Sequence, residues 1–96
     1  MRTITRRIVQ SFLLGDKRII ANSATDGRAL YLHGNKIAEY RTAEDGTLRL
    51  YITTAGWKSN TTKERLNGLP RVSIYQKAGV WYLNGQAWDG SWTMVS

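Results

Sequence analysis

The segment Gly56–Pro70 constrains the fold most, because it is the one place where a strand-like pattern gives way to a helical one. Thr61 followed three residues later by Glu64 fits a capping box at the start of a helix. Gly68 is expected to adopt the left-handed conformation that closes a helix, and the proline after it prevents continuation. The segment therefore predicts one short α-helix over residues 61–68.

In the remainder of the chain, apolar and polar residues alternate as is typical of short strands. Residues 3–14 are expected to form a long, bent strand, because β-branched side chains are dense there. Residues 28–54 alternate more regularly and predict a three-stranded antiparallel meander with one buried face and one face open to solvent. The predicted fold class is α+β: a small, mainly antiparallel sheet, bent or rolled, with Leu66 of the helix packed on its apolar face. Further strands are expected at residues 17–21, 72–76, 80–83 and 92–95, and a loop at residues 22–27.

The length of 96 residues suits a single domain over residues 1–96 with one core. The chain has no cysteine, which excludes disulfides and thiolate metal sites, and its one histidine, His33, excludes a multi-histidine metal centre. The charged first residues lead into an apolar run that is interrupted by polar side chains, unlike a signal peptide. We therefore expect a cytoplasmic protein without a membrane span.

The net charge of +7 predicts attraction to polyanions such as nucleic acid. The alternative is that the charge only keeps a small protein in solution. The basic side chains fall mainly into one cluster near the start and another around the predicted helix, which favours a surface patch. The predicted anion-binding cations are Arg6, Arg7, Lys58, Lys63, Arg65 and Arg71.

The start of the predicted helix is a candidate anion site. The backbone N–H groups of Thr61 and Thr62 could receive a phosphate or carboxylate, with Lys58, Lys63 and Arg65 nearby. The simpler interpretation is that Thr61 caps the helix and the cations are solvated.

Aromatic side chains offer a second kind of site. Trp57 and Trp81 are expected to have structural roles, while Trp88 and Trp92 are left open. Tyr31 and Tyr51 lie on the predicted solvent face of the meander, where they would form a platform with His33 and Arg49. Such a platform could stack the bases of a single strand, or bind another protein through hot-spot residues.

No motif for catalysis is present. The chain lacks the Gly-x-Ser-x-Gly elbow of hydrolases, a phosphate-binding loop and a dinucleotide-binding glycine pattern. The pair Glu44-Asp45 falls in a predicted turn, where solvated acids are ordinary. We therefore expect a protein that is not an enzyme and has no cofactor.

Several short motifs between residues 30 and 83 resemble a pattern in small bacteriophage-encoded proteins. They are Leu32-His33-Gly34-Asn35, Ile37-Ala38, Gly56-Trp57, Thr61-Thr62 and Arg65-Leu66-Asn67. The resemblance implies a setting, the cytoplasm of an infected bacterium, and it attaches no activity to any residue.

Three functions are compatible with these features. The leading hypothesis is a non-enzymatic phage accessory protein that binds a polyanion, with nucleic acid first. One alternative is a protein–protein inhibitor of a host factor, for example in host defence, acting alone or as a homo-oligomer. The other is a sponge for a signalling nucleotide.

Overall fold

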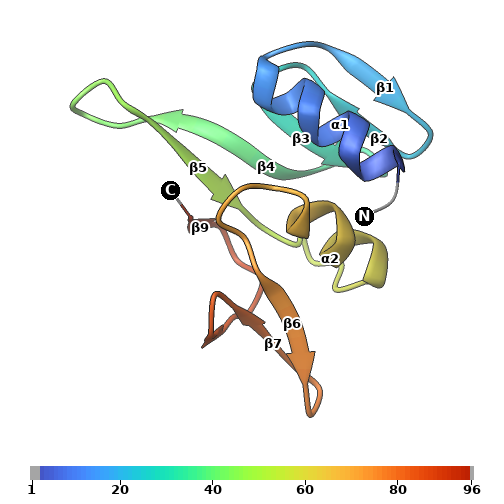
Figure 1. Cartoon of the computed structure of the whole chain (residues 1–96). Helices are drawn as coiled ribbons and strands as arrows, with labels where there is room; N and C mark the ends of the chain where they lie inside the picture. Colours follow the sequence, from blue (N-terminus) through green and yellow to red (C-terminus); the bar gives the residue numbers. More distant parts are fainter. Residues whose placement is uncertain (1–2, 96) are drawn as a thin grey trace.

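The computed structural model describes residues 3–95, which form two α-helices and two antiparallel sheets (Figure 1). This arrangement confirms the predicted α+β class. The elements in chain order are α1 (Thr3–Leu14), β1 (Arg18–Ile20), β2 (Ser23–Thr25), β3 (Ala29–Leu32), β4 (Asn35–Thr42), β5 (Leu48–Ile52), α2 (Asn60–Asn67), β6 (Ile74–Lys77), β7 (Val80–Leu83), β8 (Gln86–Ala87) and β9 (Thr93–Met94).

The larger sheet has six strands in the order β1-β2-β3-β4-β5-β9, and the smaller sheet has three in the order β6-β7-β8. The predicted meander of residues 28–54 is confirmed as β3, β4 and β5, each antiparallel to its neighbour. The segment 22–27, predicted to be a loop, instead contains β2, which pairs with β1 and β3. The C-terminal β9 closes the other edge by pairing with β5.

The prediction of a strand over residues 3–14 is wrong, because this segment is helix α1. Thr5, Ile8, Val9 and Phe12 are all buried, and their spacing of three and four residues puts them on one helical face. Burial of that face against the sheet outweighs the strand preference of the β-branched residues, which spans only about 1 kcal/mol per residue.

Helix α1 ends in a Schellman motif. Gly15 has a φ of 79°, and its N–H donates to the carbonyl of Phe12 at 3.2 Å. The N–H of Asp16 donates to the carbonyl of Ser11 at 2.9 Å. Gly15-Asp16 therefore terminates a helix and leads the chain into β1.

The predicted helix over residues 61–68 is confirmed as an element, but both of its ends differ from the prediction. Ser59 is the N-cap, and its hydroxyl accepts from the N–H of Thr62 at 3.1 Å. Gly68 is right-handed, with a φ of −74°. A side chain at Gly68 would lie 2.6 Å from the Thr5 methyl group, so glycine is required by the close approach of the two helices.

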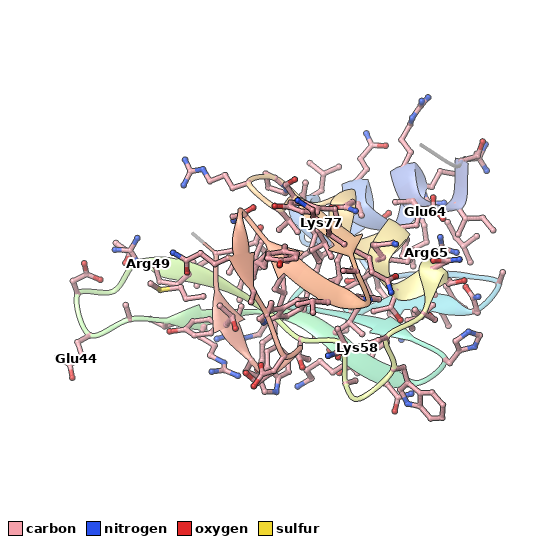
Figure 2. All side chains as sticks on the ribbon, turned by 90° about the horizontal axis from the view of Figure 1, so that it is seen from below. Glu44, Arg49, Lys58, Glu64, Arg65 and Lys77 are labelled. Atoms are coloured by element: carbon pink, nitrogen blue, oxygen red, sulfur yellow. The ribbon has the colours of Figure 1, made fainter. Side chains whose placement is uncertain are left out.

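One hydrophobic core joins both helices and both sheets. Phe12 of α1 stacks on Tyr40 of β4 with ring centroids 5.1 Å apart. Leu66 of α2 is fully buried, as predicted, and Trp81 brings the smaller sheet into the same core. In Figure 2, α1 and α2 both lie on one side of the larger sheet.

A polar network crosses this core. Arg65 of α2, of which 3% is exposed, donates to the hydroxyls of Thr5 at 2.7 Å and Ser23 at 2.9 Å. It also donates to Glu64 Oε2 at 3.0 Å and to Asn22 Oδ1 at 3.3 Å. These partners come from α1, α2, β2 and the β1–β2 turn, so one guanidinium ties the helices to the sheet edge.

We expect Arg65→Ala to lower the free energy of unfolding by about 3 kcal/mol, because it removes one partner of a buried ion pair and leaves the hydroxyls without their donor. Urea denaturation followed by circular dichroism measures the loss. Arg6→Ala, at an exposed position of α1, is the matched control and should change stability by no more than about 0.5 kcal/mol. Equal effects of the two substitutions would contradict the role of the network.

Candidate functional site

The six predicted anion-binding cations come from helix α1, the loop before α2, α2 itself and the connection after it. Arg6 and Arg7 are exposed on α1, and Lys58 is exposed in the loop before α2. Arg71 is exposed in the connection between α2 and β6, with a φ of 62°. Lys63 is half-buried, and its Nζ lies 5.6 Å from the centroid of the Trp81 ring.

The prediction that Arg65 is available to an anion is wrong, because its guanidinium is buried in the network between α1, α2 and β2. Figure 2 shows Arg65 and Arg49 toward opposite ends of the molecule. The predicted anion site at the start of α2 therefore lacks one of its three cations.

Tyr31 and Tyr51 do lie on a common face, together with residues that the sequence interpretation did not include. In an antiparallel sheet, residues directly opposite each other are on the same face. Tyr31 is opposite Lys36, and Tyr51 is opposite both Glu39 of β4 and Met94 of β9. We call this surface the aromatic–basic face; it comprises Tyr31, Lys36, Glu39, Arg41, Arg49, Tyr51, Trp92 and Met94, all of them exposed or half-exposed.

Arg41 is the centre of the aromatic–basic face. Its guanidinium carbon lies 4.3 Å from the centroid of the Tyr51 ring and 4.8 Å from that of the Trp92 ring. The Arg41 side chain remains 42% exposed. Cation–π contact with both rings holds the charge in a fixed place at the surface.

Glu39 connects the two halves of the face. Its Oε1 accepts from Arg41 Nε at 3.0 Å, and its Oε2 accepts from Lys36 Nζ at 3.3 Å. Desolvation raises the pKa of Glu39, but the hydrogen bonds from Arg41 and Lys36 outweigh it and hold the pKa below its ordinary value. Glu39 is therefore ionised at neutral pH and partly neutralises two of the cations.

The C-terminal segment carries Trp92 and is anchored to the end of β5. The carbonyl of Gly90 accepts from the Thr53 hydroxyl at 2.6 Å and from the Thr54 N–H at 2.9 Å. The hydroxyl and N–H of Ser91 donate to Asp89 and lower its pKa. These contacts set the position at which the chain enters β9.

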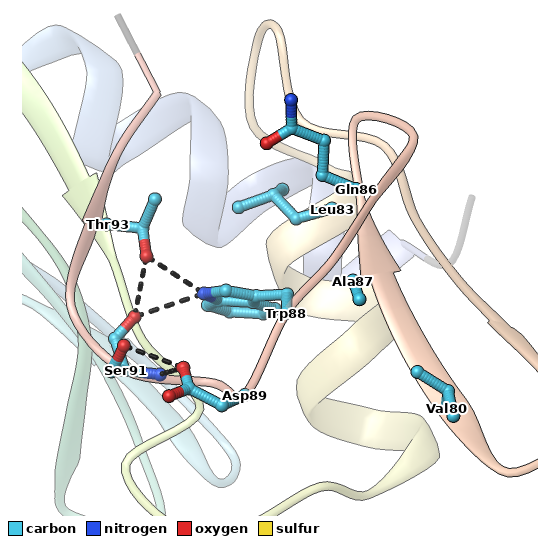
Figure 3. A pocket seen from close by; sticks show the side chains of 8 residues that line it. All are labelled: Val80, Leu83, Gln86, Ala87, Trp88, Asp89, Ser91 and Thr93. Carbon is cyan, nitrogen blue, oxygen red and sulfur yellow. Dashed lines mark hydrogen bonds between the residues drawn. The ribbon is translucent and has the colours of Figure 1, made fainter.

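A hollow of about 620 Å³ lies between this segment and the smaller sheet (Figure 3). Trp88 points into it, and its indole N–H donates to the Ser91 carbonyl at 3.1 Å and the Thr93 hydroxyl at 2.9 Å. The residues that line the hollow include Asp89 and no basic side chain. The hollow therefore does not suit a polyanion. The hydrogen bonds of Trp88 hold the C-terminal segment in place beside it.

The sequence interpretation missed Arg41, Glu39 and Trp92 as members of the site. A partial signal was available for the first two, because they share the parity of alternate residues in β4 and so one face of the strand. No local pattern indicates that Trp92 returns to Arg41, since this contact depends on the pairing of β9 with β5. His33, predicted on the same platform, lies in the β3–β4 turn instead.

Comparison with protein families shows to which family this chain belongs. The model of the Kyanoviridae Gp96 protein family matches residues 1–94. The chain belongs to this family of phage proteins. The resemblance to small bacteriophage proteins is thereby confirmed. Comparison with curated proteins finds no match, and comparison with solved structures finds none either.

Two further properties of this Kyanoviridae Gp96 family member follow from residues 3–95. Neither helix in that range is long and apolar enough to cross a membrane. Within the same range, no three acidic or histidine side chains are grouped so that they could hold a metal ion.

We expect Gly90→Ala to destabilise the protein by about 2–4 kcal/mol, because the φ of 89° strains any side chain and the new Cβ would lie 2.4 Å from Thr54 Oγ1. Gly79→Ala is the control, since its φ is 79° but nothing lies within 4 Å of the added Cβ. That variant should lose only about 1 kcal/mol from backbone strain. Urea denaturation compares the two, and equal losses would show that the space beside Thr54 does not require glycine at position 90.

Proposed function

We propose that this phage protein binds single-stranded nucleic acid on the aromatic–basic face and that it does so without catalysing a reaction. The observation that carries the proposal is the exposed guanidinium of Arg41, held between the rings of Tyr51 and Trp92. A sheet surface with accessible rings and cations matches the way in which sheet-based domains hold unpaired bases.

Base stacking supplies the first part of the argument. Tyr31, Tyr51 and Trp92 lie on three different strands or their extensions, so their rings are spread across the sheet. Each ring that stacks a base contributes about 1–3 kcal/mol. Bases in a duplex already stack on one another, so this face favours single strands over double-stranded nucleic acid.

Electrostatic attraction supplies the second part. Lys36, Arg41 and Arg49 provide three positive charges on the face. They are opposed by the carboxylate of Glu39 and, at Arg49, by the nearby charge of Asp45. The net charge of +7 on the whole chain adds a long-range attraction that guides a polyanion to the surface. Phosphates would meet Arg41 and Arg49, which are opposite each other in the register of β4 and β5.

We expect Tyr51→Ala and Trp92→Ala each to weaken binding of a labelled single-stranded oligonucleotide of about 12 nucleotides by roughly tenfold, because each removes a stacking ring. Fluorescence anisotropy at low salt measures the Kd. Raising the salt should weaken binding by the wild type with a slope of about −2 in log K against log salt, from release of counterions at three cations.

The matched control for these variants is Tyr75→Ala. Tyr75 is 45% exposed but lies on β6 of the smaller sheet, so its removal should leave the affinity unchanged. Equal affinity of Tyr51→Ala, Trp92→Ala and the wild type would place the binding surface elsewhere. No binding by the wild type at low salt would exclude nucleic acid and leave a protein partner as the function of this face.

We expect Glu39→Gln to tighten oligonucleotide binding by about three- to tenfold, because it removes the negative charge that competes with phosphate for Lys36 and Arg41. The salt dependence should become steeper at the same time, since these cations become free to contact phosphate. Anisotropy titrations at two salt concentrations test both effects. Weaker binding by Glu39→Gln would mean that the carboxylate positions Arg41 for its ligand.

A further inference from the structure

A second cavity is lined by residues outside the aromatic–basic face, from the β3–β4 hairpin and from the segment that leads to α2. Its volume is about 380 Å³. Leu32 and Ile37 form an aliphatic floor, Ser59 and Thr62 form one wall, and His33 and Trp57 lie at its edge. We call it the Trp57 cavity.

Trp57 is the most unusual side chain in this cavity. The sequence predicts a structural role for it, but it is 65% exposed, the highest value among the four tryptophans, of which Trp92 is next at 39%. A single exposed apolar ring is ordinary at a protein surface, but one that lines a cavity offers a flat face to a planar ligand.

The backbone presents Trp57 at a cost. Ala55 and Gly56, which precede it, both have positive φ angles, of 56° and 84°. The left-handed conformation is unfavourable for alanine by about 1–2 kcal/mol. The turn is held by a hydrogen bond from the Trp57 N–H to the Thr54 carbonyl at 2.9 Å and by one from the Ala55 N–H to the Thr53 hydroxyl at 3.2 Å. A strained turn beside a cavity places a flat ring at its mouth.

We infer that the Trp57 cavity binds a single nucleotide through its base. The volume is near the lower end of the ~300–1,000 Å³ of small-molecule sites, which suits one nucleotide and is too small for two. The indole ring of Trp57 provides a stacking partner for a planar base, and the aliphatic floor provides a dry surface for its far edge.

Polar groups at the rim provide hydrogen bonds to the edge of the base. The side chains of His33 and Asn35 come from the β3–β4 hairpin and line the same cavity as Trp57. None of the residues that line the cavity is acidic, so the phosphate of a nucleotide meets no repelling carboxylate in the lining. This inference stands apart from the proposed function, because none of these residues belongs to the aromatic–basic face.

The nucleotide could be free in solution or part of a strand, and the chemistry of recognition is the same in both cases. The test uses NMR of ¹⁵N-labelled protein, in which the indole N–H signals of the four tryptophans are followed separately. Adenosine, guanosine, cytidine and uridine 5′-monophosphates are titrated to about 10 mM, where even a Kd of ~1 mM gives near-saturation. The expected result is a saturable shift of the Trp57 signal, with those of the buried Trp81 and Trp88 unchanged.

Trp57→Ala should weaken mononucleotide binding at least tenfold, measured by isothermal calorimetry and by the shifts of residues in the β3–β4 turn. The control is Tyr75→Ala, which removes an exposed ring of β6 that belongs to neither site and should leave mononucleotide binding as in the wild type. Because Trp57 is outside the core, its variant should keep the urea midpoint of the wild type, which separates lost binding from lost folding.

A short oligonucleotide is the second arm. If it shifts the Trp57 signal and the mononucleotides do not, the nucleotide is supplied as part of a strand, and the inference holds in that form. If neither ligand shifts the Trp57 signal, the inference is wrong. Oligonucleotide binding that depends on Tyr51 and Trp92 would still support the proposed function in that case, so the two failures are distinguishable.

Discussion

The buried guanidinium of Arg65 is the interaction on which the remainder of the structure depends. A charge removed from water is costly unless its donors are satisfied, and a single partner would not be enough. Arg65 has acceptors on Thr5, Asn22, Ser23 and Glu64, which are together only when α1, α2 and the β1–β2 hairpin are in their final positions. The network thereby specifies one relative placement of the helices and the sheet.

That placement has a consequence for the opposite side of the larger sheet. Both helices are engaged in one core with the inner face, so the outer face keeps its alternate side chains available to a ligand. Arg65 and Arg41 illustrate the division. The first is enclosed by hydroxyl and carboxylate groups, whereas the second lies against the rings of Tyr51 and Trp92 and remains 42% exposed.

Much of the fold was predictable from local patterns. Alternation over residues 28–54 predicted three paired strands. The start and stop signals between Gly56 and Pro70 predicted α2 to within one residue at each end. Helix α1 was not predicted, because its β-branched residues favour a strand and only burial of Thr5, Ile8, Val9 and Phe12 selects the helix. The prediction of a left-handed conformation for Gly68 was wrong. A glycine is needed there because α1 and α2 approach each other closely.

The candidate site was predictable only in part, because some of its contacts join segments that are far apart in the chain. Alternation placed Tyr31 and Tyr51 on the solvent face, since strand periodicity is a local property of the chain. The sequence by itself determined this periodicity, the excess of positive charge and the positions of the turns. The tertiary structure decided which cations are buried, that Trp57 is exposed, and that Trp92 returns to Arg41. These outcomes depend on contacts between segments far apart in the chain, and no short-range pattern of residue types encodes which distant side chains will enclose a given group.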